Sequence, residues 1–367
     1  MALILAVLMA AVLFYAQWKY FKSHWQHKLS VQVQFCQRAA NAGERCQLRE
    51  VIYNAKRMPL PALQMKFQTS ATFHFDEEEN ASVSDHYYRT DLFAVKGNQK
   101  VTRILEFTPS QRGYYQIRAL DVLARDFFLT SHYSSRRENE TGLYVYPYKR
   151  DVRRLDLLYR QMMGQMLARK RMEEDPFAFR GIREYYPTDS MRHINWKSSA
   201  QNGKLLVNIY ESSFSREVCI LLDGHTRSVM DKRYMQEYGI SIASSVAGKF
   251  LGMGVPVSLK TDTRDILSGE LVCTEKGSNR YHLDSIDRSL ARIDLEAGME
   301  PFAELVRETI SEKGNNPSYL LITSSYSQDL EEQICIQRRI GAELYLILPC
   351  REGDVPPEID GVFCWET

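Results

Sequence analysis

The sequence predicts a chain of mixed class: an apolar N-terminal helix, an antiparallel β-sandwich of immunoglobulin type, and a doubly wound α/β domain. Three observations carry this prediction. The first 16 residues contain no charged side chain. Residues 29–148 alternate apolar and polar side chains in short runs between glycines, as half-buried strands do. Residues 216–367 alternate short apolar runs with helical patterns, which indicates strands buried on both faces by helices.

The overall composition excludes some classes of function. The 47 basic and 46 acidic residues give a net charge of +1, so no basic excess points to nucleic acid. The seven cysteines contain no Cys-x-x-Cys pair, and neither a disulfide framework nor a zinc site is indicated. We therefore expect no cofactor.

Residues 1–21 are predicted to form a transmembrane helix. A helix needs about 20 apolar residues to cross the hydrocarbon layer, and this stretch ends in aromatic residues suited to a membrane interface, namely Trp18, Tyr20 and Phe21. A cleaved signal peptide is the alternative, but the segment lacks a basic start and a clear cleavage site. Because Lys19, Lys22 and Lys28 follow the apolar run, the positive-inside rule predicts a single-pass protein of the cell membrane with the bulk of the chain in the cytoplasm. The abrupt start leaves open a further transmembrane helix upstream.

The sandwich is expected over residues 29–148, with little helix signal. Alternation predicts strands at Val31–Phe35, Ala71–Phe75, Val101–Phe107, Tyr114–Leu120 and Leu143–Tyr146. A connecting helix follows over residues 151–172, with Asp151 as its N-cap. Its apolar stripe is expected to pack against the neighbouring domain, with a partner groove as the alternative: Val152, Leu155, Leu158, Met162 and Met166.

Residues 175–211 interleave charged, aromatic and turn-forming side chains more densely than any other stretch. Neither helical nor strand periodicity persists there, so we expect a semi-irregular connection with many fixed polar contacts. Arginine–carboxylate pairs would lock it, and Trp196 would anchor it in a pocket. The stretch is either a latch between domains or a docking surface for a partner. Its candidate residues are Arg180, Arg183, Glu184, Tyr185, Asp189, Arg192 and Trp196.

The last domain, residues 216–367, is expected to alternate strands and helices. Strands are predicted at 218–222, 255–260, 319–323 and 344–348, and helices at 234–251, 281–293, 301–311 and 330–340. Ligands of such sheets bind at the carboxyl ends of the strands. This places attention on Asp223–Ser228 and Thr323–Ser325.

The stretch at 175–211 resembles the signature of a bacterial family, the domain of unknown function 58. The matching residues are Phe179-Arg180-Gly181-Ile182-Arg183-Glu184-Tyr185-Tyr186-Pro187-Thr188-Asp189, then Arg192-His193-Ile194-Asn195-Trp196-Lys197-Ser198-Ser199-Ala200-Gln201, ending at Glu211. Arg112-Gly113-Tyr114 and Asp126–Leu129 also match. Thr188, Asn195 and Gln201 depart from the family's usual Gly, Asp and Arg.

The resemblance implies a membrane helix, a β domain and a von Willebrand factor A-like α/β domain. It also implies partners: a MoxR-type AAA+ ATPase and a transglutaminase-like membrane protein, with no established activity. A metal-binding von Willebrand A domain uses Asp-x-Ser-x-Ser after its first strand. Here the residues are Asp223-Gly224-His225-Thr226-Arg227, so we expect a degenerate site at Asp223 and Thr226 that holds no metal.

Catalytic motifs are missing from the sequence. It has no Gly-x-Ser-x-Gly, no phosphate-binding Gly-x-x-x-x-Gly-Lys-Ser/Thr loop and no His-Glu-x-x-His. We predict a non-enzymatic, membrane-anchored adaptor or scaffold for an AAA+ ATPase or a cell-envelope assembly. The alternative is a divalent-metal-dependent binding module. A third class, a hydrolase using Ser199 near His193, has the least support.

Overall fold

The fold is that of a computed structural model of the chain. The structure describes residues 2–76, 81–84, 86–151, 155–172, 174–187, 189–212, 217–226, 232–297, 301–311, 317–350 and 362–366. Within these ranges, the side chains of residues 2, 81, 83, 167–172, 174–178, 180, 209–212, 226, 232 and 366 are not described. The chain divides into two compact units, Met1–Tyr148 and Lys149–Thr367.

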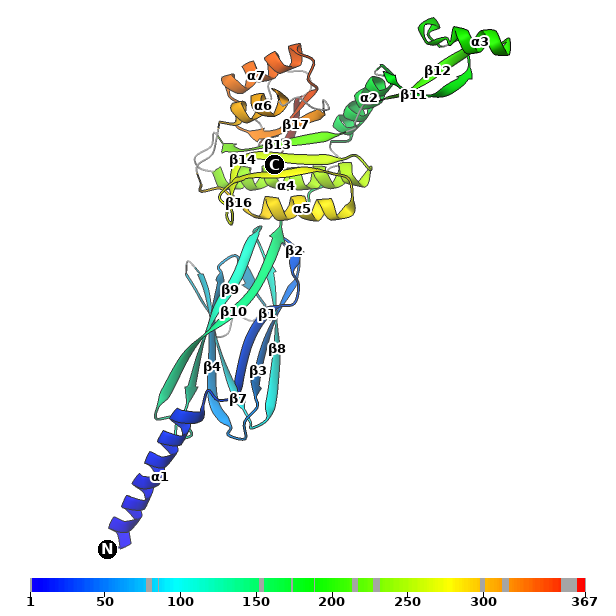
Figure 1. The fold of residues 1–367 in the computed structure, drawn as a ribbon. Coiled ribbons are helices and arrows are strands. Elements are labelled where there is room, and N and C mark those ends of the chain that lie inside the picture. The colour runs from blue at the N-terminus through cyan, green and yellow to red at the C-terminus, as the bar shows by residue number, and fades with distance from the viewer. Residues whose placement is uncertain are drawn as a thin grey trace. The chain divides into compact units, whose positions relative to one another are not determined.

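The first unit begins with helix α1 (Ala2–His24), the dark blue helix of Figure 1. Its segment Leu3–His24 has a mean hydropathy of 1.6 and is long and apolar enough to span a membrane, a test that a signal sequence also passes. The helix extends three residues beyond the predicted end at residue 21. One expectation was wrong: Phe21 is not at an interface but fully buried, because it packs with Trp25 into the core of the following sandwich.

The rest of this unit is a sandwich of two sheets, as expected. The first sheet has the order β1 (Leu29–Phe35), β3 (Cys46–Asn54), β8 (Gln99–Pro109), β5 (Phe73–Phe75). The second has the order β2 (Ala39–Asn41), β10 (His132–Tyr146), β9 (Gly113–Arg125), β4 (Leu60–Ser70), β7 (His86–Val95), β6 (Ala81–Val83). All neighbours are antiparallel except β2 and β10. The sequence missed β3, β4 and β7; in β3 and β7, inward charged residues interrupt the apolar alternation.

Those inward charges form an ionic cluster between the two sheets. Arg89 and Asp91 of β7 are both fully buried, and the Arg89 Nε donates to Asp91 Oδ2 over 2.7 Å. Arg103 of β8 donates to the other oxygen, Oδ1, over 2.8 Å. Glu50 of β3 lies directly opposite Arg103 and is buried, and burial together with the nearby Asp91 raises its pKa to about 8. The sandwich therefore holds charged groups at positions where apolar side chains usually meet.

The second unit is built on a sheet with the order β15 (Leu271–Gly277), β14 (Val257–Asp265), β13 (Val218–Thr226), β17 (Ser318–Ser324), β18 (Leu344–Cys350), β19 (Val362–Glu366). β13, β14, β17, β18 and β19 are parallel, whereas β15 runs antiparallel to β14. The short β16 (Ile293–Asp294) also pairs with β14. The sequence missed the two edge strands, β15 and β19; β15 is largely exposed, so it lacks a continuous apolar run.

Helices cover both faces of this sheet. One face packs against α2 (Asp156–Met172), α4 (Lys232–Gly252) and α5 (Arg280–Ala291), and the other against α6 (Phe302–Ser311) and α7 (Gln328–Arg339). The doubly wound prediction is thus confirmed for this sheet. Asp151 is not the N-cap of α2, because the helix begins at Asp156. Leu155, Leu158, Met162 and Met166 are buried in the core on the first face, as the packing prediction expected; Val152 lies outside the described residues.

The segment predicted to be semi-irregular is mostly regular. β11 (Glu174–Glu184) pairs antiparallel with β12 (Leu206–Ser212), and between them lie the 3-10 turn η2 (Met191–His193) and helix α3 (Trp196–Asn202). Figure 1 shows these elements in green. Two register shifts in β11 break the alternation that would have marked it as a strand. We call residues 174–212 the signature arm.

Candidate functional site

Among its described side chains, the signature arm contains a bidentate arginine–carboxylate pair. Arg183 Nη1 and Nη2 donate to Asp189 Oδ2 and Oδ1 over 2.5 and 2.6 Å, the bidentate arrangement that the sequence suggested. Asp189 Oδ2 also accepts from the backbone N–H of Tyr186 over 2.9 Å. The hydrogen bond from Arg183 lowers the pKa of Asp189 to about 2. The turn after β11 is therefore closed by a carboxylate that stays ionised at physiological pH.

The other predicted residues of the arm lie on its surface or at its backbone. Glu184 pairs with Lys204 over 2.9 Å, with both side chains exposed, a contact of small energetic value. Tyr185 is half-buried and its N–H donates to Leu205 O. Arg192 lies in η2 and is exposed. Arg180 lies in β11, but its side chain is outside the described set.

Trp196 does not fill a pocket. It begins α3 with 67% of its surface exposed, so the expectation that it anchors the segment was wrong. The reason is local: α3 is held to β12 by its polar face instead. The side chain of Asn195 caps α3 by accepting from Ser198 N over 2.9 Å, and its Nδ2 donates to Asn208 Oδ1 over 2.8 Å.

Ser199 is part of that same polar face. Its hydroxyl donates to Asn195 O over 2.7 Å and accepts from Leu206 N over 2.9 Å, and the residue is 8% exposed. A hydroxyl that is buried and bonded twice to the backbone positions a helix. This geometry gives no support to Ser199 as a nucleophile.

A second constellation lies at the carboxyl ends of three parallel strands. Asp223 and His225 end β13, Asp262 lies near the end of β14, and Thr323 near the end of β17. His225 Nδ1 lies 3.0 Å from Asp223 Oδ1 and 2.8 Å from Asp262 Oδ2. Thr323 Oγ1 donates to Asp223 Oδ2, and Gly224 N donates to Asp262 Oδ1. We call Asp223, His225 and Asp262 the Asp–His–Asp cluster.

The electrostatics of the Asp–His–Asp cluster favour a charged imidazole. Hydrogen bonds to Asp223 and then to Asp262 raise the pKa of His225 to about 10. Burial raises the pKa of Asp262 to about 6. The imidazolium thus occupies the space between two carboxylates, where a cation would otherwise be needed to offset their charge.

The cluster also has the composition of a metal site. One ligand atom from each of Asp223, His225 and Asp262 lies within 4.8 Å of the others. The sequence predicted a degenerate metal site at Asp223 and Thr226. Asp223 belongs to the Asp–His–Asp cluster, whereas the side chain of Thr226 is outside the described set. Sequence reasoning missed Asp262 because the strand seemed to end at residue 260. The run Thr261-Asp262-Thr263 directly after the predicted strand was the available signal, and the structure buries all three residues.

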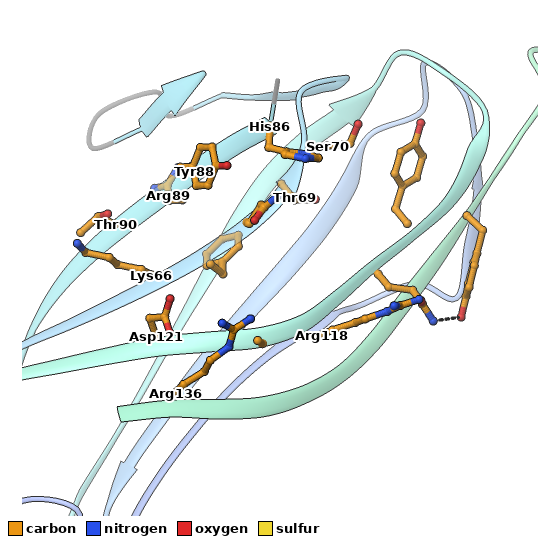
Figure 2. Close-up of a pocket in the computed structure, with 16 residues that line it drawn as sticks. Lys66, Thr69, Ser70, His86, Tyr88, Arg89, Thr90, Arg118, Asp121 and Arg136 are labelled. Atoms are coloured by element: carbon orange, nitrogen blue, oxygen red, sulfur yellow. Dashed lines mark hydrogen bonds between the residues drawn. The ribbon is translucent and has the colours of Figure 1, made fainter. Parts of the chain in front are cut away.

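The sandwich carries a separate groove of about 590 Å³ on the outer face of its six-stranded sheet. Figure 2 shows Lys66, Asp121 and Arg136 side by side on neighbouring strands, with Arg118 and Tyr88 further along. Register places Asp121 opposite both Lys66 and Arg136. The charged side chains of its lining are mostly basic, with Asp121 as the acidic one. Ser70 and His86 lie opposite each other in register, but Ser70 Oγ bonds to Thr72 Oγ1 over 2.8 Å, so the groove does not suggest a reaction.

Comparisons with known proteins give only weak likenesses. No protein-family model and no curated protein matches the chain. Among solved structures, a non-cellulosomal cohesin from Archaeoglobus fulgidus is 9% identical with a TM-score of 0.23, covering 32% of this chain and 91% of that one. A CARDB domain from Pyrococcus furiosus is 10% identical with a TM-score of 0.20, covering 31% and 86%. A cohesin of scaffoldin B from Acetivibrio cellulolyticus is 10% identical with a TM-score of 0.24, covering 32% and 99%.

Proposed function

We propose that this protein is a membrane-anchored, non-enzymatic adaptor that presents its signature arm to a partner protein. The observation that carries the proposal is an ordered arm with exposed aromatic and basic side chains. Phe179, Tyr186 and Trp196 are 57%, 61% and 67% exposed, and Met191 is 72% exposed. Tryptophan, tyrosine and arginine dominate the energetics of protein–protein interfaces.

The architecture of the arm supports the same proposal. Among its described side chains, the buried apolar ones are Ile194 and Val207. A two-stranded sheet is marginally stable alone. Its exposed apolar side chains would gain free energy from burial against a partner.

The likeness of sequence to domain of unknown function 58 supplies candidate partners: a MoxR-type AAA+ ATPase and a transglutaminase-like membrane protein. Membership of that family and a von Willebrand A-like second unit are part of the proposal. In the sheet of the second unit, the third strand along the chain, β15, lies at the edge and runs antiparallel to β14. This strand order supports a von Willebrand A-like second unit. α1 would be the anchor, and Lys19, Lys22 and Lys28 support a cytoplasmic location for the rest.

The test is affinity capture from a detergent extract with the full chain as bait and mass spectrometry of the captured proteins. We expect wild type to capture an AAA+ ATPase. The variant Arg192→Ala/Trp196→Ala should capture at least about tenfold less, because hot-spot side chains each contribute roughly 2 kcal/mol or more. Tyr281→Ala is the matched control, since Tyr281 is an 86% exposed aromatic of the same unit outside the arm. Equal capture by wild type and the double variant, or no ATPase in any eluate, contradicts the proposal.

A second candidate function is divalent-metal-dependent binding, favoured specifically by the Asp–His–Asp cluster. An imidazole nitrogen with two carboxylate oxygens suits Mn²⁺ or Zn²⁺ better than Mg²⁺, which prefers oxygen ligands only. Asp223, His225 and Asp262 would hold the ion, which would replace the proton on His225 Nδ1. We expect isothermal titration calorimetry of the full chain to show saturable binding of one of these ions, lost in Asp262→Asn and retained in Asp284→Asn. Asp284 is a suitable control because it forms an exposed helical ion pair with Arg288. Wild type without saturable heat for any of the three ions would remove this candidate.

A further inference from the structure

The turn between β9 and β10 displays three consecutive large apolar side chains. Phe127, Phe128 and Leu129 are 39%, 61% and 56% exposed. Single exposed apolar residues are ordinary on protein surfaces. Three consecutive exposed apolar side chains at the tip of a turn form a patch of the kind that marks a contact with a protein or a membrane.

This turn has a fixed shape. Asp126 is fully buried, and its carboxylate accepts from Thr130 N over 2.7 Å, from Thr130 Oγ1 over 2.7 Å and from Ser131 N over 3.2 Å. Leu129 N donates to Asp126 O over 3.1 Å. Leu129 adopts φ +56°, a left-handed conformation that glycine or asparagine would occupy at lower cost. The turn thus keeps a large apolar side chain at its tip despite backbone strain.

The turn also lies against α1. The rings of Phe128 and Phe14 stack with centroids 5.7 Å apart, and those of Phe127 and Phe21 meet edge-on at 5.5 Å. Phe14 precedes His24, the last residue of α1, by ten positions, or about 15 Å along the helix. Phe128 therefore reaches well inside the segment Leu3–His24 that is long enough to span a membrane.

Polar and aromatic groups of α1 locate the membrane surface relative to this contact. Trp18 packs near Tyr15, and Lys22 Nζ lies 5.0 Å from the Trp18 ring. Such aromatic and lysine side chains favour the headgroup level. Phe14 is on the apolar side of Trp18, and Phe128 stands beside Phe14. At the base of the turn, Arg125 of β9 lies opposite His132 of β10, and both side chains are exposed. Basic side chains at this position suit the anionic headgroup region of a membrane.

We propose that the turn at residues 126–131 enters the lipid bilayer beside α1 and forms a second membrane contact. The inference rests on the proposed membrane anchorage of α1. A lone helix leaves an attached domain free to rotate and tilt, whereas a second inserted element restrains both. Interfacial elements of this kind bury their apolar side chains about 5–10 Å into the boundary between headgroups and acyl chains. Phe128 and Leu129 would thereby hold the sandwich in one orientation against the membrane surface.

The test uses tryptophan fluorescence of the full chain reconstituted in phosphatidylcholine vesicles with or without brominated acyl chains. The variant Phe128→Trp adds a tryptophan at the tip, and Ile104→Trp adds one at a 50% exposed site on β8 of the same sandwich. The chain has four native tryptophans, so the signal lost in Trp18→Phe relative to wild type isolates Trp18 and reports whether α1 itself is inserted. We expect the signal that Phe128→Trp adds over wild type to be blue-shifted. Brominated lipid should lower it roughly twofold or more, since insertion brings the ring to acyl-chain depth. The signal added by Ile104→Trp should not change.

Each outcome decides the proposal. Quenching of the added tryptophan at position 128 but not at 104 supports it. If Trp18 is quenched and the tryptophan at 128 is not, α1 is inserted but the turn is outside the bilayer, and the inference is wrong while the anchorage stands. If the tryptophan at 128 is blue-shifted without quenching, a protein surface covers the turn instead. If neither Trp18 nor the tryptophan at 128 is quenched, the anchorage fails and the inference fails with it.

Discussion

Replacing Arg89 with methionine is expected to lower the free energy of unfolding of the first unit by about 3–5 kcal/mol. The fully buried Asp91 would lose the Arg89 partner at 2.7 Å and keep the one at 2.8 Å from Arg103. A buried carboxylate that loses a hydrogen-bonded cation is left with a desolvation cost that the remaining contacts no longer offset. The measurement is limited proteolysis in increasing urea, with the fragments assigned to each unit by mass spectrometry.

Two further variants separate the ion pair from simple packing. Arg118→Met removes an exposed arginine from the outer face of the same sheet and should change stability by no more than about 0.5 kcal/mol. The double variant Arg89→Met/Asp91→Leu should recover most of the loss, because apolar residues of similar volume replace a buried pair at little cost. Glu50 and Arg103 remain opposite each other in that variant. An urea midpoint for Arg89→Met equal to wild type would contradict the prediction.

The second large effect is expected at the Asp–His–Asp cluster. Asp223→Asn should destabilise the second unit by about 1.5–3 kcal/mol at pH 6, because Asp223 accepts hydrogen bonds from His225 N, His225 Nδ1 and Thr323 Oγ1. The side chain of His225 is 41% exposed, so solvent screens part of the ion pair. We therefore expect a smaller destabilisation than for a fully buried charged pair.

The same variant should flatten the pH dependence of stability. The folded-state pKa of His225 is raised to about 10 from an ordinary value of 6.5. The folded state then binds the proton more tightly, so this contribution is fully present below pH 6.5 and is lost as pH rises through 10. Wild type should lose stability between pH 7 and 10, and Asp223→Asn should lose less. Urea midpoints of the second unit at pH 6, 8 and 9.5 measure this, with Asp284→Asn as the control. Parallel pH profiles for the two proteins would show that His225 does not carry the proton.

Sequence reasoning succeeded where a local pattern determines the structure. The uncharged start of α1, the inward alternation of β1 and the continuous apolar run of β17 each follow from neighbours along the chain. It failed at β3 and β7, since Glu50, Arg89 and Asp91 occupy inward positions that usually hold apolar residues. It also failed in the signature arm, where the register shifts of β11 disrupt the period of two.

The candidate sites show the same division. The pair Arg183–Asp189 was accessible from the sequence because its members are six residues apart in one turn. Trp196 was misjudged because exposure depends on what packs over a residue, which spacing does not report.

By itself, the sequence determined an apolar helix, an alternating β region and a doubly wound α/β region, because hydrophobic periodicity reflects which faces are buried. Only the tertiary structure brought His225 to Asp262, 37 residues away, and Asp223 to Thr323, 100 residues away. It likewise placed Phe128 beside Phe14. In a parallel sheet, adjacent strand ends are separated by a whole crossover, so no local pattern records which side chains will meet there.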